Sequence, residues 1–116
     1  MTKTLGEFER FVLLALLELE SEEAYGVPIR EVIERRTGEE FSSGAVYTAL
    51  DRLEESGLVR STIGEPTAER GGRRKRLYRL EPAGLRALDR SVRVHDSMVR
   101  GLLPRLRARL AKVKSS

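Results

Sequence analysis

The sequence lacks cysteine altogether, and histidine occurs only once, at position 95. Disulfide bonds and thiolate metal sites are therefore excluded, and one histidine does not predict a zinc site, so we expect no metal and no other cofactor. The longest apolar run, residues 11–17, is far too short to cross a bilayer. The N-terminus also shows no secretory signal pattern. These absences predict a cytoplasmic protein.

The residue patterns of common enzymes are missing as well. With one histidine and no cysteine, the sequence offers no set of nucleophile, base and orienting group. No glycine pattern that cradles a phosphate follows a strand-like segment, and the one adjacent glycine pair, Gly71 and Gly72, lies in a predicted hairpin. We therefore expect that the protein is not an enzyme.

The net charge of +4 is distributed unevenly over the 116 residues. Residues 1–57 have a balance of −7, residues 58–80 of +5 and residues 81–116 of +6. A basic second half favours a polyanionic partner such as a nucleic acid. On charge alone, a solvated basic surface is an equally good interpretation.

Helical spacing predicts two helices in the first forty residues. From Phe8 onward, apolar residues recur three and four positions apart, and further leucines follow on the other side. A helix that is apolar nearly all round must be covered on two faces, by its own domain and by a second surface such as another subunit. The second helix is expected to begin near Tyr25, with Pro28 in its first turn, and to end at Gly38. The additional leucines of the first helix are Leu13, Leu14 and Leu17.

The third predicted helix has clear ends and two different faces. Ser42 or Ser43 can cap its N-terminus, and Gly57 ends it. One face is a buried apolar stripe and the other is polar, as in a helix that enters the major groove of DNA. An ordinary solvent-facing surface explains the polar face equally well. The buried stripe consists of Val46, Leu50 and Leu53.

Two strand-like segments follow, at residues 58–63 and 76–80. The segment between them is polar and rich in glycine, so it predicts a hairpin loop rather than a packed element. Four consecutive basic residues at 73–76 fit contacts with phosphates or with the minor groove. The alternative, a solvated turn, is less favoured after a helix-turn-helix pattern.

The last segment predicts one long helix that begins at Pro82 and extends over residues 83–110, about 42 Å at 1.5 Å per residue. Its apolar residues alternate in steps of three and four, which is typical of a seam that packs against a partner helix. A kink or break is expected near Gly101 and Pro104. The seam consists of Leu85, Leu88, Val92, His95, Val99, Leu102, Leu106 and Val113. His95 is interpreted as an interface residue, with pH or ligand sensing as the alternative.

Taken together, these segments resemble the PadR family of bacterial transcriptional regulators. Residues 5–17 and 24–29 look like the family's first helix and the start of its second. Residues 43–59, SGAVYTALDRLEESGLV, resemble its recognition helix and first wing strand, and residues 71–84 resemble its wing and second strand. The C-terminal helix is similar in position and length to that of the family's short-chain branch. In place of the Thr that commonly caps this helix in the family, the chain has Glu81, which caps less well.

The resemblance implies a mostly helical winged helix-turn-helix with a small β-hairpin. Residues 1–80 would form the DNA-binding domain and residues 81–116 a C-terminal dimerisation helix. The implied function is a sequence-specific transcriptional regulator, a repressor that binds a near-palindromic operator as a homodimer. Some family members release double-stranded DNA when a small-molecule effector binds. A winged helix that binds protein instead of DNA is the alternative.

The resemblance also assigns functional residues. Ser43 and Tyr47 would bind phosphates, while Thr48 and Arg52 would reach phosphates or base edges. The complete set implied to contact DNA is Ser42, Ser43, Gly44, Tyr47, Thr48, Arg52, Arg70, Arg73, Arg74 and Lys75. The expected dimer interface comprises Leu13, Leu14, Leu17, Leu85, Leu88, Val92, His95, Val99, Leu102 and Leu106.

Overall fold

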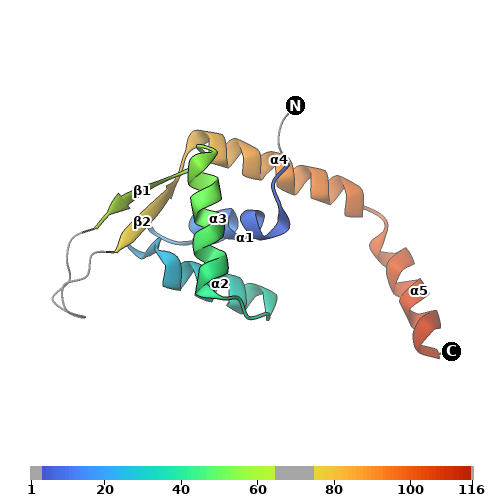
Figure 1. Cartoon of the computed structure of the whole chain (residues 1–116). Coiled ribbons are helices and arrows are strands. Elements are labelled where there is room, and N and C mark those ends of the chain that lie inside the picture. Colours follow the sequence, from blue (N-terminus) through green and yellow to red (C-terminus); the bar gives the residue numbers. More distant parts are fainter. Residues whose placement is uncertain (1–3, 65–74, 116) are drawn as a thin grey trace.

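A computed structural model describes residues 4–64 and 75–115 of the chain. Within these residues, three helices form a compact body, an antiparallel hairpin extends from one side of it, and two further helices lead away on the other side (Figure 1). The elements are α1 Glu7–Glu18, the short 3-10 helix η1 Ser21–Glu23, α2 Gly26–Thr37, α3 Ser43–Glu55, β1 Val59–Ile63, β2 Arg76–Leu80, α4 Pro82–Val99 and α5 Leu103–Ser115. The arrangement is the mostly helical winged fold that the sequence predicts.

The core lies where α1, α2 and α3 meet. Each helix contributes side chains that are almost wholly removed from solvent, among them Leu13, Ile29 and Leu50. Burial of one such side chain is worth about 1.5–3 kcal/mol. Tyr78 of β2 and Leu88 of α4 close the same core, so the hairpin and the start of α4 belong to one hydrophobic unit with the three helices.

The predicted ends of α2 and α3 are confirmed. Gly38 follows α2 with a φ of 75°, a left-handed conformation that favours glycine, and its N–H donates to the carbonyl of Glu34. At the start of α3, the hydroxyl of Ser42 accepts a hydrogen bond from the N–H of Ala45 at 3.1 Å. The segment between α2 and α3 is therefore anchored at both ends.

The two strands pair antiparallel, with Val59 opposite Leu80 and Ile63 opposite Arg76. The first strand begins one residue later than the sequence predicts, because the N–H of Leu58 still donates to the carbonyl of Leu53 at the end of α3. In the second strand, β2, the N–H of Tyr78 donates to the carbonyl of Ala24 at 2.8 Å. The wing is therefore joined directly to the segment that precedes α2.

The C-terminal segment forms two helices, separated by a break at Gly101. This residue has a φ of 78°, and α5 begins two residues later. Pro104 lies in the first turn of α5, where its missing N–H costs no hydrogen bond. The expected interruption is therefore confirmed, with glycine as the residue that turns the chain. At the start of α4, Glu81 makes no side-chain cap, and its carboxylate instead pairs with Arg60 at 3.3 Å.

Two residues expected at the dimer surface are core residues in this structure. Leu13 is fully buried and Leu88 is 5% exposed within the single chain. Neither side chain has surface left for a partner, so their assignment to an interface is corrected to the core. None of the helices in the described part of the chain is both long enough and apolar enough to span a bilayer.

Candidate nucleic-acid interface

The outward face of α3 presents a set of exposed polar groups. Its inward stripe of Val46, Ala49, Leu50 and Leu53 is buried and fixes the rotation of the helix about its own axis. The opposite face is therefore held toward solvent in one orientation, as a helix that enters a groove requires. The exposed residues on this face include Ser43, Gly44, Tyr47, Thr48 and Arg52.

Arg30 of α2 lies beside the N-terminal end of this face. Its Nη1 donates to the hydroxyl oxygen of Ser43 at 3.0 Å, which places a cation next to a residue expected to contact DNA. The sequence gives no signal for Arg30, because it is a single arginine in a helix of mixed charge. Only the packing of α2 against α3 brings the two side chains together.

Tyr47 lies against the first turn of α2. A Cβ atom added at Gly26 would come within 2.3 Å of the Tyr47 hydroxyl oxygen, so the absence of a side chain at Gly26 makes room for the phenol. The first N–H groups of a helix have no partner within that helix, and such N-termini favour anions. The position of the Tyr47 hydroxyl is thus compatible with a phosphate contact. Gly26 is a second residue that sequence reasoning missed.

Lys75, at the base of the wing, is held by Tyr25. The ammonium nitrogen lies 4.3 Å from the centre of the Tyr25 ring and donates to its hydroxyl oxygen at 3.3 Å. A cation over an aromatic face is attracted by the ring and loses part of its freedom. The charge of Lys75 is therefore fixed near the body. The other predicted wing residues, Arg70, Arg73 and Arg74, lie outside the described residues.

A polar chain connects the C-terminal end of α3 to both strands of the wing. The Glu54 carboxylate accepts hydrogen bonds from the N–H of Ser61 at 3.1 Å and from its hydroxyl at 2.7 Å. The hydroxyl oxygen of Ser61 in turn accepts from Arg76 at 2.9 Å. Because charge-assisted hydrogen bonds are the stronger kind, this chain sets the position of the wing relative to α3.

The remaining candidate dimer residues lie along the surfaces of α1, α4 and the segment beyond it. Leu17 and Leu106 are more than half exposed, at 58% and 62%. Val99 is partly buried. The residues of this group that are exposed are Leu14, Leu17, Leu85, Val92, His95, Leu102 and Leu106. Among the described residues, none of the seven belongs to the hydrophobic core cluster, so their exposed area is available to a partner.

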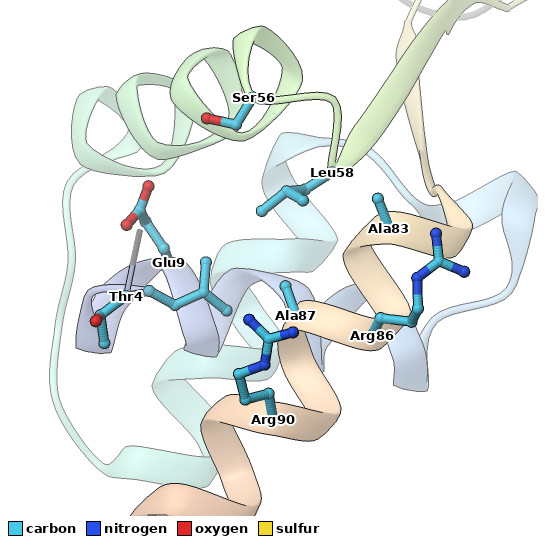
Figure 2. Close-up of a pocket in the computed structure, with 9 residues that line it drawn as sticks. Thr4, Glu9, Ser56, Leu58, Ala83, Arg86, Ala87 and Arg90 are labelled. Atoms are coloured by element: carbon cyan, nitrogen blue, oxygen red, sulfur yellow. The ribbon is translucent and has the colours of Figure 1, made fainter. Parts of the chain in front are cut away.

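A cavity of about 310 Å³ lies between the N-terminal segment and α4 (Figure 2). Arg86 and Arg90 of α4 line it, and across from them lie Glu9 of α1 and Ser56 at the end of α3. A neighbouring cavity of about 320 Å³ shares Arg90 and continues along α4 to His95. Both cavities thus adjoin the body as well as the helix that leads away from it. In the described part of the chain, potential metal ligands form no group of three or more.

The family described as "Transcriptional regulator PadR-like family" matches residues 13–90. A search of curated proteins gives no match. Among solved structures, a transcriptional regulator from Clostridium thermocellum is 24% identical, with a TM-score of 0.66 over 79% of this chain and 85% of that one. A PadR family transcription regulator from Clostridium difficile is 22% identical, with a TM-score of 0.65 over 87% and 98% of the two chains. RosR of H. salinarum is 25% identical, with a TM-score of 0.62 over 96% and 91%.

Proposed function

Because this chain belongs to the PadR-like family of transcriptional regulators, we propose that it represses transcription by binding a near-palindromic operator as a homodimer. The observation that supports this most directly is the orientation of α3. Its buried stripe holds an exposed polar face outward, beside a basic hairpin. That combination of helix and wing suits a groove and its flanking phosphates.

In the proposed complex, α3 enters the major groove. Thr48 and Arg52 reach base edges or phosphates, while Ser42, Ser43, Gly44 and Tyr47 position the helix on the backbone. The wing, with Arg70, Arg73, Arg74 and Lys75, contacts phosphates or the minor groove beside it. In this proposal residues 1–80 bind DNA and residues 81–116 join two chains.

The proposed dimer uses the exposed apolar residues of α1 and α4. Two chains related by a two-fold axis bury this surface twice and place both recognition helices on one side of the assembly. For two successive major grooves, the helices must lie about 34 Å apart. One half-site provides too few contacts for tight binding, so operator binding requires the pair.

The proposed regulator also responds to a small molecule. The two cavities along α4 are lined by residues of the body and by residues of α4. A ligand that fills them alters the angle between α4 and the body, and with it the spacing of the two recognition helices. Binding of such a ligand therefore favours or disfavours the spacing that the operator requires.

Selection of bound sites from a random DNA pool, followed by titration of the selected site at several salt concentrations, tests the proposal. The logarithm of the binding constant should fall linearly with the logarithm of the salt concentration, with a slope of about −0.9 per phosphate contacted. Thr48→Ala and Arg52→Ala should change the preferred sequence. Arg73→Ala combined with Arg74→Ala should weaken binding to all sequences alike.

Two results would contradict this proposal. If affinity stays constant from low to physiological salt, the protein does not bind DNA through its basic groups, and the winged helix is a protein-binding module instead. If the full-length chain is monomeric at micromolar concentration and still binds its operator tightly, the homodimer is wrong. The titration measures the salt dependence of the first case, and light scattering on the same samples measures the molar mass that decides the second.

A further inference from the structure

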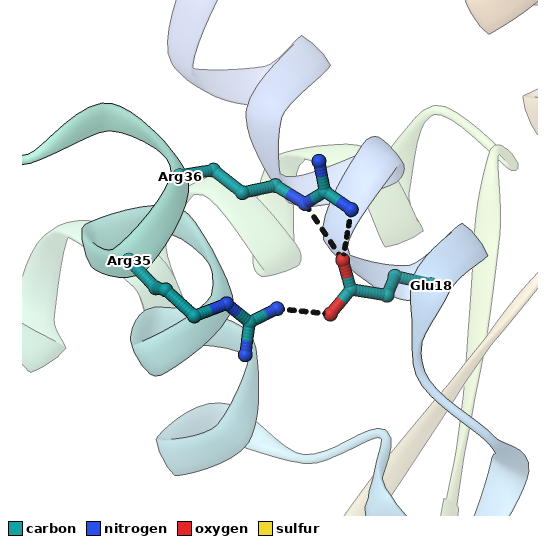
Figure 3. A network of polar contacts seen from close by, with 3 residues as sticks. All are labelled: Glu18, Arg35 and Arg36. Carbon is teal, nitrogen blue, oxygen red and sulfur yellow. Dashed lines mark hydrogen bonds and ion pairs between the residues drawn. The ribbon is translucent and has the colours of Figure 1, made fainter.

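The three arginines of α2 differ in how their charges are balanced. Arg35 and Arg36, in the last turn, both bind the carboxylate of Glu18 (Figure 3). Arg30, at the other end of the helix, forms no ion pair with any residue that the structure describes. Glu34 lies one helical turn from Arg30, but its carboxylate instead accepts the backbone N–H seven residues further along the chain, at 2.8 Å. The charge of Arg30 is therefore not compensated within the described chain.

The guanidinium of Arg30 also lacks acceptors for its hydrogen bonds. An arginine side chain offers several N–H donors. One of them has an acceptor among the described residues, since Nη1 donates to the hydroxyl oxygen of Ser43 at 3.0 Å. Nε is buried without a hydrogen-bond partner, and no other buried side-chain nitrogen or oxygen in the described residues is left in that state. Because an unpaired buried donor destabilises a fold, this arrangement calls for an explanation.

Arg30 lies close to the N-terminal ends of two helices. It follows the first turn of α2, and Ser43, which it contacts, is the first residue of α3. A helix N-terminus carries a partial positive charge, so it disfavours a nearby cation and favours an anion. The first turn of α1 contains two glutamates, whereas the first turns of α2 and α3 contain no acidic residue. The positive charge at this junction is therefore not offset by either helix start.

We propose that Arg30 binds a backbone phosphate of DNA beside the N-terminal end of α3. This assignment rests on the proposed DNA-binding function and adds to it a contact from α2, outside the recognition helix and the wing. A phosphate oxygen accepts hydrogen bonds from the guanidinium and supplies the missing negative charge. The place is suitable, because Ser43 touches Arg30 and is itself expected to contact a phosphate. Arg30 then positions α3 on the backbone and reads no base.

The surroundings of Arg30 favour DNA over a small free anion. Arg30 contacts Ser43 at the junction of α2 and α3. One helical turn away along the same junction, Gly26 of α2 faces the hydroxyl of Tyr47. Arg30 lines neither of the two cavities along α4. A row of donors along an exposed junction suits an extended polyanion, whereas a small ligand is normally held in a concave pocket.

Arg30→Met tests the assignment, because it roughly keeps the length of the side chain and removes its charge. On the selected operator and on a random duplex of equal length, the full-length variant should bind roughly tenfold more weakly at low salt. The slope of the logarithm of the binding constant against that of the salt concentration should become shallower by about 0.9 for each half-site. Arg30→Lys retains the charge and should retain the wild-type slope.

Arg35→Met is the matched control for the loss of one charge. It removes an arginine from the other end of the same helix, while Arg36 keeps its contact with Glu18. Its salt slope should equal that of the wild type. A slope that becomes equally shallow in Arg35→Met and Arg30→Met would show a general effect of net charge and would overturn the contact.

Thermal unfolding of the free protein separates binding from a structural role. If Arg30 only supports the fold by holding Ser43, Arg30→Met should lower the melting temperature. The proposed contact predicts a melting temperature equal to or above that of the wild type, because the substitution removes an uncompensated cation and a buried donor without an acceptor. A lower melting temperature together with an unchanged salt slope would overturn the assignment.

Ethylation interference on the selected operator locates the contact. Ethylation of the phosphate that Arg30 binds removes its negative charge and should weaken binding of the wild type. The same ethylated phosphate should have no effect on Arg30→Met, while interference at the other phosphates remains. An identical interference pattern for the two proteins overturns the contact even if the affinity of the variant falls.

The outcomes also separate this contact from the proposed function. A wild-type chain whose affinity for both duplexes does not depend on salt overturns DNA binding and the contact together. If the wild type shows a steep salt slope and Arg30→Met shows the same slope and affinity, DNA binding stands and the Arg30 contact is wrong. If Arg30→Met changes the preferred sequence, Arg30 reads a base edge and the phosphate assignment is wrong.

Discussion

Gly84, in the first turn of α4, allows the helix to lie directly against the backbone of Leu58. A Cβ atom at this position would come 2.1 Å from the Leu58 carbonyl oxygen and 3.1 Å from its carbonyl carbon. Since carbon and oxygen atoms normally stay about 3.3 Å apart or more, Gly84→Ala requires a backbone shift of roughly 1.2 Å. We therefore expect this small substitution to be destabilising.

The carbonyl of Leu58 has little freedom to move away. It accepts the N–H of Glu81 at 3.0 Å, while the N–H of Leu58 donates to Leu53 at 2.9 Å. Overpacking of this kind costs about 1–3 kcal/mol, and loss of the hydrogen bond from the N–H of Glu81 adds about 0.5–1.5 kcal/mol. The better helix propensity of alanine offsets up to about 1 kcal/mol. The net expected loss in the free energy of unfolding is about 0.5–4.5 kcal/mol.

Gly44→Ala is the matched control, because Gly44 also lies in the first turn of a helix. A Cβ atom there has only the Ser42 hydroxyl oxygen near it, at 3.9 Å. Both substitutions restrict the unfolded chain equally, so their difference isolates the contact with Leu58. Urea unfolding followed by circular dichroism, at one fixed protein concentration, measures both. If Gly84→Ala is as stable as Gly44→Ala, the close approach of α4 to Leu58 is refuted.

Three further predictions concern polar contacts and the helix break. Hydrogen bonds from Arg36 and then from Arg35 hold the pKa of the Glu18 carboxyl below its ordinary value, so Glu18→Gln should lower stability at neutral pH. The difference in the free energy of unfolding between wild type and Glu18→Gln should shrink as pH falls below about 4.3, the pKa of an unfolded Glu, and vanish below the lowered pKa of Glu18 in the folded chain. A difference that stays constant in acid unfolding curves would contradict the ion pair. Glu54→Ala leaves the Ser61 N–H without its acceptor and should destabilise by about 1–3 kcal/mol, with faster hydrogen exchange at that amide as the specific sign. Gly101→Ala together with Pro104→Ala should join α4 and α5 into one helix and make the ellipticity at 222 nm more negative. Gly101→Asn should leave the ellipticity unchanged, because asparagine tolerates the left-handed conformation.

Much of the fold could be predicted because its boundaries are marked by local chemistry. A serine hydroxyl at position 42 and a glycine at position 38 determine helix ends through interactions within a few residues. Alternating polarity likewise predicts the second strand, residues 76–80, with its observed bounds. Such signals depend only on neighbours in the chain, so one sequence is enough to read them.

The candidate site was less predictable, because its supporting contacts join distant parts of the chain. Lys75 and Tyr25 are fifty positions apart, and the contact between Gly26 and Tyr47 depends on how α2 packs against α3. The spacing of residues in the sequence predicts neither contact. The resemblance to a family selected Lys75 and Tyr47, but the residues that hold them, Tyr25 and Gly26, became visible only in the structure.

The misassignment of Leu88 shows what helical spacing alone cannot decide. Leu85, Leu88 and Val92 follow the regular steps of a coiled-coil seam, yet Leu88 is buried in its own domain while Leu85 and Val92 are 46% and 42% exposed. A helix that leaves a domain presents one stripe to two surfaces, first to the body it starts from and then to a partner. Because Gly84 brings the first turn of α4 onto Leu58, the body covers the inner edge of this stripe at Leu88. The residues of α4 available to a second chain are therefore those on the outer edge and those beyond the body.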